Sequence, residues 1–348
     1  MAGKPRRRPD SAALLAERVA HGKSAAVGAL LFAARALNNP SMAKRLDAAE
    51  VKALFHRLSN WGRWGREDQR GALNFITAQK RLAASRLMLT GQAVSLALPL
   101  PTAPAADNPN PVTHLTFQMG TEPKAAYHQS MDYFAIAPHG MATTHLDALC
   151  HVFWQNKMYN GFDAAEVRAD GAHRCGVEAV RDGVLTRGVL LDIPALRGVR
   201  WLEPGDAIFP EELEAAQQLH RVDVSEGDVL FVRTGRTLKR RTDGAWDVMR
   251  HGMAGLDASC LPWLFERRIA MLGSDAISDV APSGYKETPF PIHAIAIVAM
   301  GVHLIDNADL EALAQACATH GRHDFLFVLA PLVLERGTSS PVNPLAFL

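Results

Sequence analysis

The stretch that decides the fold and the chemistry of this chain is PHGMATTHLDALCHVF, residues 138–153. Within it, His145 and Asp147 are two residues apart, which places their side chains on one face of a strand. Asp147 and His151 are four residues apart, which places their side chains on one face of a helix. A change from strand to helix near Asp147 would bring all three together. The same spacing also fits polar residues that cap a helix, with Thr144 or Asp147 as the cap.

On both sides of this stretch, strand-like and helix-like patterns alternate along the chain. Strands are predicted at residues 94–98, 115–119, 133–136, 188–193, 229–233, 269–272 and 325–329. Helices are predicted at residues 78–89, 210–220, 259–268 and 310–319. Interleaved strands and helices predict an α/β (α+β) fold. Because no repeat or low-complexity linker interrupts residues 60–348, we expect a single catalytic domain over residues 56–348.

Residues 1–55 form an Ala-rich segment with apolar residues at helical spacing. We therefore expect a helical N-terminal extension. Its longest apolar stretch, residues 25–37, is too short to span a bilayer and contains Arg35. An amphipathic helix must bury its apolar face, so a homo-oligomer is one expected consequence, and packing on the chain's own body is the alternative.

Composition and charge limit the classes of partner and the cellular compartment that we expect. The chain has 348 residues, 37 basic against 36 acidic, and a net charge of +1, which gives no electrostatic reason to expect nucleic acid or a membrane as partner. Hydrophobic residues make up 48%, enough for a large core. The four cysteines form no C-x-x-C pair and are far apart, so we expect reduced thiols in a cytoplasmic protein.

The chain lacks the sequence motifs of several common active sites, so the histidine–aspartate cluster is the main candidate for a functional site. The chain has no H-E-x-x-H, no G-x-S-x-G and no dinucleotide fingerprint. Imidazole and carboxylate ligands together suit zinc or manganese. Three protein ligands would leave a coordination position open for water, as hydrolysis requires.

The stretch resembles the signature of the cyclase-like metal-dependent hydrolase family, which includes bacterial kynurenine formamidases and isatin hydrolases. That family's pattern is H-x-G-T-H-x-D-x-x-x-H-F, and His145, Asp147 and His151 match three of its metal or catalytic positions. Further stretches at residues 60–65, 190–193, 232–235 and 273–278 also look familial. The resemblance covers about residues 60–335 and implies a swivelling β/β/α-type domain.

The chain departs from the family pattern at its first histidine, which falls on Met141. A thioether is a poor ligand for a hard catalytic ion, so we expect one divalent ion, zinc or manganese, where relatives hold two. His139 could replace the missing ligand only if the strand slipped or bulged, and we expect it to contact either substrate or a metal-ligating side chain instead.

The resemblance also implies a downstream histidine and a carboxylate that complete the metal site. His293 and Asp306 fall at these positions, although their spacing is one residue longer than the pattern, and His303 is a rival ligand. We expect His145, Asp147, His151 and Asp306 as metal ligands and His151 and His293 as catalytic groups. Whether His151 is a ligand or a proton shuttle stays open.

These parts predict hydrolysis of an amide, lactone or ester through a metal-activated water. A small cyclic or aromatic substrate is expected, because aromatic residues accompany the cluster: Trp61, Trp64, Phe153, Trp154 and Tyr159. Each of these aromatics could equally belong to the core. There are two alternatives. The protein could be a metal-assisted cyclase or lyase, or a non-catalytic relative that only binds a metal or ligand.

Overall fold

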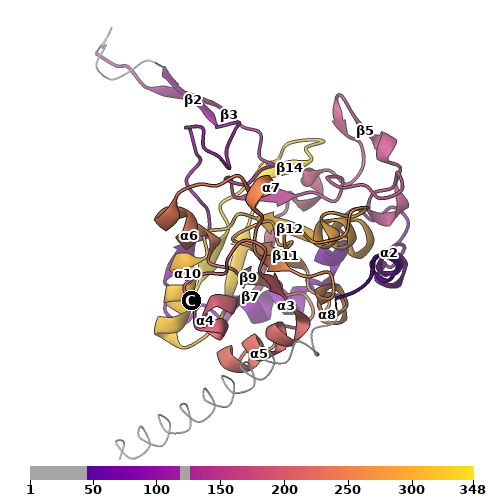
Figure 1. Cartoon of the computed structure of the whole chain (residues 1–348). Coiled ribbons are helices and arrows are strands. Elements are labelled where there is room, and N and C mark those ends of the chain that lie inside the picture. Colours follow the sequence, from indigo (N-terminus) through magenta and orange to yellow (C-terminus); the bar gives the residue numbers. More distant parts are fainter. Residues whose placement is uncertain (1–44, 118–125) are drawn as a thin grey trace, which may run out of the picture.

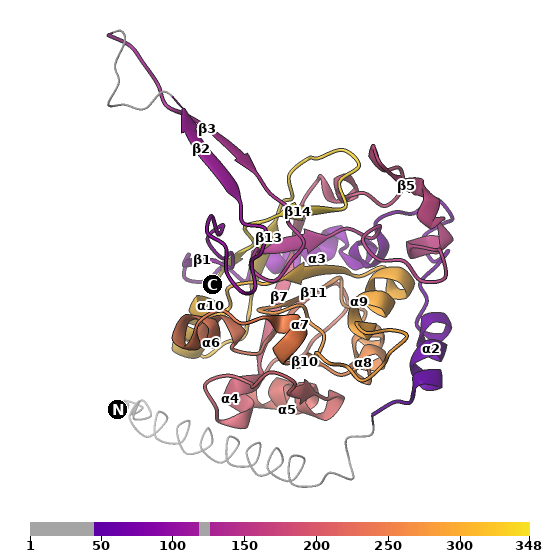
Figure 2. The same cartoon turned by 45° about the horizontal axis from the view of Figure 1, so that its top comes forward.

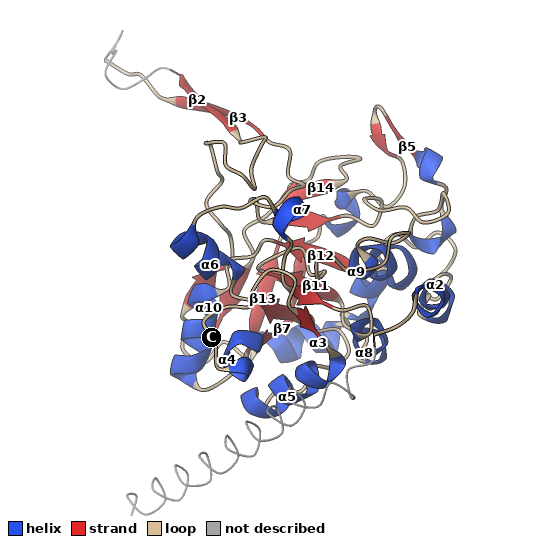
Figure 3. Cartoon of the chain, in the orientation of Figure 1, coloured by secondary structure: helices blue, strands red, loops and turns tan. Residues whose placement is uncertain are grey.

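The computed structural model describes residues 45–117 and 126–348. The N-terminal helices predicted before residue 45, and the end of the strand predicted at 115–119, lie outside these residues. A large mixed sheet occupies the centre of the described part, with helices around it (Figures 1 and 3). This is the α+β architecture that the interleaved sequence pattern predicts.

The large sheet has nine strands in the order β1-β15-β13-β7-β9-β11-β12-β4-β14. Their bounds are β1 Ala93–Ser95, β4 His145–Asp147, β7 Val184–Asp192, β9 Val229–Arg233, β11 Met271–Ser274, β12 His303–Asp306, β13 Asp324–Leu329, β14 Ser339–Pro341 and β15 Leu345–Phe347. Strands β7, β9, β11 and β12 are parallel, and β4 pairs antiparallel with β12 on one side and β14 on the other. Small ribbons form from β2 Thr113–Phe117 with β3 Met131–Ala135, β5 Val167–Arg168 with β6 Gly171–Ala172, and β8 Ala207–Ile208 with β10 Gly255–Leu256.

Helices connect and cover the strands. They are α2 Ala48–Arg57, α3 Ala78–Ser85, α4 Ile193–Arg197, α5 Pro210–His220, α6 Arg236–Asp243, α7 Val248–His251, α8 Cys260–Glu266, α9 Pro291–His293 and α10 Glu311–His320. Short 3-10 turns lie at Gly71–Phe75, Tyr159–Gly161, Ala164–Glu166 and Val177–Val180, and a π-helix, Ala294–Met300, continues α9.

Local sequence explains why these elements form. Strands β9 and β11 are buried at every position, as expected for parallel strands covered on both faces. Helix α5 begins with Pro210 at its first turn, and Glu212 accepts a hydrogen bond from the Phe209 N–H. Helix α10 ends at Gly321 in the left-handed conformation.

Two local predictions need correction. The chain does not enter a helix after Asp147: β4 ends there, and a turn follows in which the His151 N–H bonds the Ala148 carbonyl. The helix predicted at 78–89 ends earlier, at Ser85. The division into an extension and a domain at residue 55 stays a prediction; helix α2 runs across that point, and its Val51 and Leu54 pack in the main core.

All four cysteines are buried and free of disulfides, as predicted. Among the residues of 45–117 and 126–348, no helix is both long and apolar enough to cross a membrane. The ribbon of β2 and β3 projects away from the body, as two views show (Figures 1 and 2).

Candidate metal centre

The centre is built on β4, the short strand near one edge of the large sheet. Alternation places His145 and Asp147 on one face, and the two side chains approach to 3.4 Å between Nε2 and Oδ1. In the neighbouring β12, Asp306 lies directly opposite His145. Residues opposite each other across a ladder share a face, so Asp306 joins the pair, with its Oδ2 4.0 Å from His145 Nε2. All three residues are buried.

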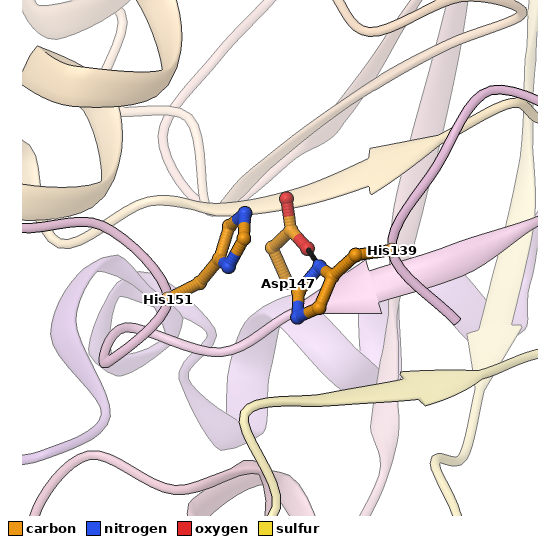
Figure 4. Close-up of side chains that lie close together, drawn as sticks. All are labelled: His139, Asp147 and His151. Carbon is orange, nitrogen blue, oxygen red and sulfur yellow. Dashed lines mark ion pairs between the residues drawn. The ribbon is translucent and has the colours of Figure 1, made fainter. Parts of the chain in front are cut away.

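Loops on both sides of β4 bring two further imidazoles to Asp147 (Figure 4). His139, which precedes the strand, lies with its Nδ1 3.0 Å from Asp147 Oδ1. His151, which follows the turn, stacks on His139 with ring centroids 3.7 Å apart. His139 was predicted to contact substrate because Met141 occupies the motif position. The His139 ring lies beside the central carboxylate and also lines the cavity described below, so its contact with substrate stays a prediction.

His293 reaches the centre from α9, on the other side of Asp147 and Asp306. Its Nε2 is 3.2 Å from Asp306 Oδ2 and 3.6 Å from Asp147 Oδ2. Its Nδ1 lies 2.7 Å from Asp279 Oδ2. Asp279 also accepts the backbone N–H groups of Ile292 and His293, which fixes the start of α9 against it. A carboxylate behind an imidazole in this way holds the ring orientation and leaves Nε2 facing the centre.

The donor atoms fit a divalent metal ion. Two trios each place one ligand atom per residue within 4.8 Å of the others: His145 with Asp147 and Asp306, and His139 with Asp147 and His151. Both oxygens of Asp147, and Oδ1 of Asp306, are buried without a hydrogen bond. Imidazole nitrogens of His139 and His145 lie 3.0 and 3.4 Å from Asp147 Oδ1. A buried carboxylate is costly, by several kcal/mol, unless a cation compensates it, and either a protonated imidazole or a divalent ion can do so. In a metal site, buried oxygens and imidazole nitrogens point toward one common position. The two trios have this arrangement.

Charge is distributed unevenly among the histidines of the centre. Burial lowers the pKa of His145, but the charges of Asp147 and Asp306 outweigh it and raise that pKa to about 9. Burial lowers the pKa of His151 to about 4, so its imidazole is neutral at neutral pH. The carboxylates of Asp147 and Asp306 therefore attract positive charge, while neutral His151 has a nitrogen lone pair available for a metal or a proton.

A cavity of about 330 Å³ opens over the centre. Besides the histidines and carboxylates described above, mostly apolar and aromatic side chains line it: Met141, Val152, Phe153, Trp154, Ile277, Phe290 and Ala294. Glu287, Thr288 and Pro289 complete one side. Phe153 was predicted as a substrate contact and lies here.

Three other aromatics predicted to contact substrate lie outside this cavity. Trp61 donates its indole N–H to the Val298 carbonyl, and Trp64 packs edge-on against Phe75. Tyr159 is fully buried and donates its hydroxyl to Asp68. Tyr159 lies in the core and Trp64 packs against it, whereas Trp61 is 40% exposed. None of the three lines the cavity, so their predicted contact with substrate is corrected.

The rival ligand His303 is also separated from the centre. It lies on β12 three residues before Asp306, an odd spacing that directs its side chain to the opposite face of the sheet. Burial lowers its pKa to about 3, so it is a neutral core histidine. Asp279 and Phe290 were missed by sequence reasoning, although Asp279 directly follows the familial stretch 273–278.

Comparison with known proteins identifies the family of the chain. The model of the family described as "Putative cyclase" matches residues 93–279. A crystal structure of a novel cyclase is 30% identical, with a TM-score of 0.76, over 84% of this chain and 99% of that one. The chain belongs to the cyclase family.

More distant structures share the cyclase-family fold. Isatin hydrolase A from Ralstonia solanacearum is 19% identical, with a TM-score of 0.54, over 78% of this chain and 97% of that one. Isatin hydrolase A from Labrenzia aggregata is 18% identical, with a TM-score of 0.53, over 73% and 93%. No curated protein matches the chain in sequence. The predicted family and the α+β fold are thus confirmed.

Proposed function

We propose that this cyclase-family chain is a metal-dependent hydrolase that cleaves an amide, lactone or ester bond of a small, uncharged ring compound. The observation that supports the proposal best is the pair of buried carboxylates, Asp147 and Asp306, at the floor of a cavity: both oxygens of Asp147 and Oδ1 of Asp306 lack a hydrogen bond. Buried acceptors in that state fit a bound cation. Isatin hydrolases share this fold, which supports the proposed hydrolase function.

The centre has enough donors for two ions that share Asp147. His145, Asp147 and Asp306 would hold one, and His139, Asp147 and His151 the other. The expectation of a single ion rested on Met141, and His139 supplies the missing imidazole. Mixed imidazole and carboxylate donors suit zinc or manganese. Bound there, a divalent ion supplies Lewis-acid activation of a water and of the scissile carbonyl.

The chain's own groups account for proton transfer and orientation. His293 lies between Asp279 and the two central carboxylates, so its Nε2 can deliver a proton to the leaving group at the cavity floor. Asp279 positions His293 by accepting from Nδ1. His151 would serve as a ligand of the second ion, which leaves proton transfer to His293.

The cavity lining favours a neutral, flat substrate. Phe153, Trp154 and Phe290 offer aromatic surface. No Lys or Arg is among the described lining residues, and Glu287 adds negative charge. A substrate carboxylate would therefore meet no compensating cation other than the metal. Isatin-like cyclic amides and simple arylformamides fit this environment better than substrates that carry a free carboxylate.

A hydrolysis panel tests this function. The metal-depleted chain is supplied with Mn²⁺ or Zn²⁺ and offered isatin, an arylformamide, an aryl lactone, a cyclic imide and a carboxylate-bearing arylformamide. We expect turnover of at least one neutral compound only after metal is added, and slower turnover of the anionic one. Metal-independent turnover, or no turnover of any compound, would overturn the proposal.

A further inference from the structure

Residues 140–143, called the connecting segment here, form a bend that joins His139 to strand β4. One side chain binds both ends of this bend. The Asn307 carboxamide donates through Nδ2 to the Gly140 carbonyl at 2.7 Å and to the Thr143 carbonyl at 3.1 Å. These two bonds satisfy backbone groups that would pair with a neighbouring strand if the segment were part of the sheet. The shape of the connecting segment therefore depends on Asn307.

Asn307 combines three features that each cost stability. It is fully buried, and its backbone is left-handed with φ +53°. Its Oδ1 is buried and finds no hydrogen-bond donor among the described residues. A glycine would adopt the left-handed backbone without burying a polar side chain. What the carboxamide adds over glycine is its pair of bonds to the connecting segment, and features of this kind are typical of functional sites.

These bonds link three segments that carry donors of the metal centre. Asn307 directly follows Asp306 on the chain. The connecting segment begins directly after His139. The Thr143 carbonyl also lies 2.9 Å from His145 Nδ1, so it accepts from that nitrogen and leaves Nε2 facing the centre. One carboxamide thus connects the backbone around Asp306, His139 and His145.

The two histidines depend on this link unequally. His145 lies on β4, whose register is fixed by pairing with β12 and β14. His139 lies in a loop, where its ring stacks on His151 and approaches Asp147 and the Thr338 hydroxyl (Figure 4). Its Nδ1 is buried and makes no hydrogen bond to the described residues. The position of His139 beside Asp147 therefore depends on the connecting segment, whereas that of His145 depends on the sheet.

A second side chain holds the connecting segment at its middle. The Arg236 guanidinium donates to the Met141 carbonyl at 2.7 Å and to Asp107 at 3.1 Å. Arg236 is buried, and Asp107 also forms an ion pair with Arg240. The connecting segment is thus restrained at both ends by Asn307 and at its middle by Arg236.

We propose that Asn307, assisted by Arg236, is a positioning residue of the metal centre. It fixes the connecting segment so that His139 supplies the imidazole that the first position of the motif lacks. The inference rests on the proposed function, since it assumes that both trios of donors bind an ion. Loss of the Asn307 donors should release the ion beside His139 and retain the ion held by His145 and Asp306.

Mn²⁺ binding by the full chain tests this proposal without a substrate. Calorimetric titration of the wild type should show two ions per chain, and electron paramagnetic resonance should show magnetic coupling between them, because they share Asp147. Asn307→Gly keeps the left-handed backbone and removes the carboxamide. In this variant we expect the affinity of one ion to fall about 10–100-fold, with little change at the other, and the remaining ion to give an uncoupled spectrum.

A matched control and a double-mutant cycle show through which histidine Asn307 acts. Asn156→Gly makes the same substitution at an exposed, left-handed Asn and should bind two coupled ions. His139→Ala removes the second trio directly. Adding Asn307→Gly to it should not weaken the remaining ion, because both substitutions act on the same site. A further fall of similar size would overturn the proposal, since Asn307 would then act through another ligand.

Arg236→Lys tests the connecting segment from its other side and decides the matter if Asn307→Gly does not fold. It keeps a positive charge near Asp107 and loses the guanidinium donor to the Met141 carbonyl, so we expect it to weaken the same ion. Two coupled ions of wild-type affinity in each folded variant would overturn the inference and leave the proposed function intact. A wild type with a single ion would do the same, whereas a wild type that binds no ion would overturn both.

Discussion

Asp147 is the residue on which the centre depends most, because both candidate trios share it. Asp147→Asn keeps the size of the side chain and removes its charge. We expect the affinity for Mn²⁺ to fall by at least about 100-fold, since a ligand matters at least as much as its outer-sphere partners. Calorimetric titration with Mn²⁺ measures this. Asp182→Asn, which neutralises an exposed carboxylate, is the control, and equal affinity in the Asp147 variant would contradict the assignment.

Asp279 illustrates how a residue can act through another. The substitution Asp279→Asn weakens the hydrogen-bond acceptor for His293 Nδ1, so the imidazole ring loses its fixed orientation. We expect kcat to fall about 10–100-fold, with a smaller change in KM, because the cavity lining is untouched. Steady-state kinetics on a substrate found in the hydrolysis panel separates the two constants. A larger effect on KM than on kcat would show that Asp279 shapes binding instead.

The sequence predicted the residues of the centre better than it predicted how they meet. His145 and Asp147 follow from strand alternation, a local property. His151 arrives through a turn instead of a helix, and His139 through a loop, because tertiary packing sets those paths. Asp279 carries no local sign of its role, since its partner His293 is 14 residues away. Tyr159 and Trp64 pack in and against the core, and Trp61 lies outside the cavity. Sequence alone does not distinguish such positions of an aromatic side chain from contact with substrate.

At the scale of elements, the end of the π-helix that follows α9 is closely packed. Gly301 has φ +67° there, and an added Cβ would overlap ring atoms Cδ2 and Cε2 of Tyr159. Gly301→Ala therefore combines backbone strain with overpacking, and we expect a loss of about 2–4 kcal/mol in the free energy of unfolding. Thermal or urea unfolding measures it.

Gly321 provides the matched control. It has φ +64° at the end of α10, but a Cβ there would meet nothing within 4 Å. Gly321→Ala should cost only about 1 kcal/mol, the cost of the left-handed backbone. Equal losses in the two alanine variants would show that contact with Tyr159 plays no part.

Elements with strong local signals were predicted closely, and short ones were not. Helix α5 and strand β9 match their predicted bounds, because capping residues and continuous apolar runs define them. Strand β14, Ser339–Pro341, has no apolar alternation, and pairing with β4 alone makes it a strand. Sheet order, which places β4 between β12 and β14, depends on long-range pairing and could not be derived from local patterns.

At the scale of the whole molecule, a bound ion should stabilise the fold. The unfolded chain does not hold His145, Asp147 and Asp306 together, so an ion that binds the native state adds about 2.7 kcal/mol when its concentration is 100 times its Kd. We expect a higher melting temperature with Mn²⁺ or Zn²⁺ and reversal by a chelator, measured by scanning calorimetry. An equal rise of the melting temperature in the Asp147→Asn variant would show that the stabilising ion binds at another site.

The most direct test of the account is anomalous diffraction from crystals of the chain grown with Mn²⁺. We expect strong anomalous peaks at coordination distance from Asp147, one also bound by His145 and Asp306 and one by His139 and His151. Peaks confined to other parts of the molecule, or no peak beside Asp147 at saturating Mn²⁺, would contradict the claim that this cluster is a metal centre.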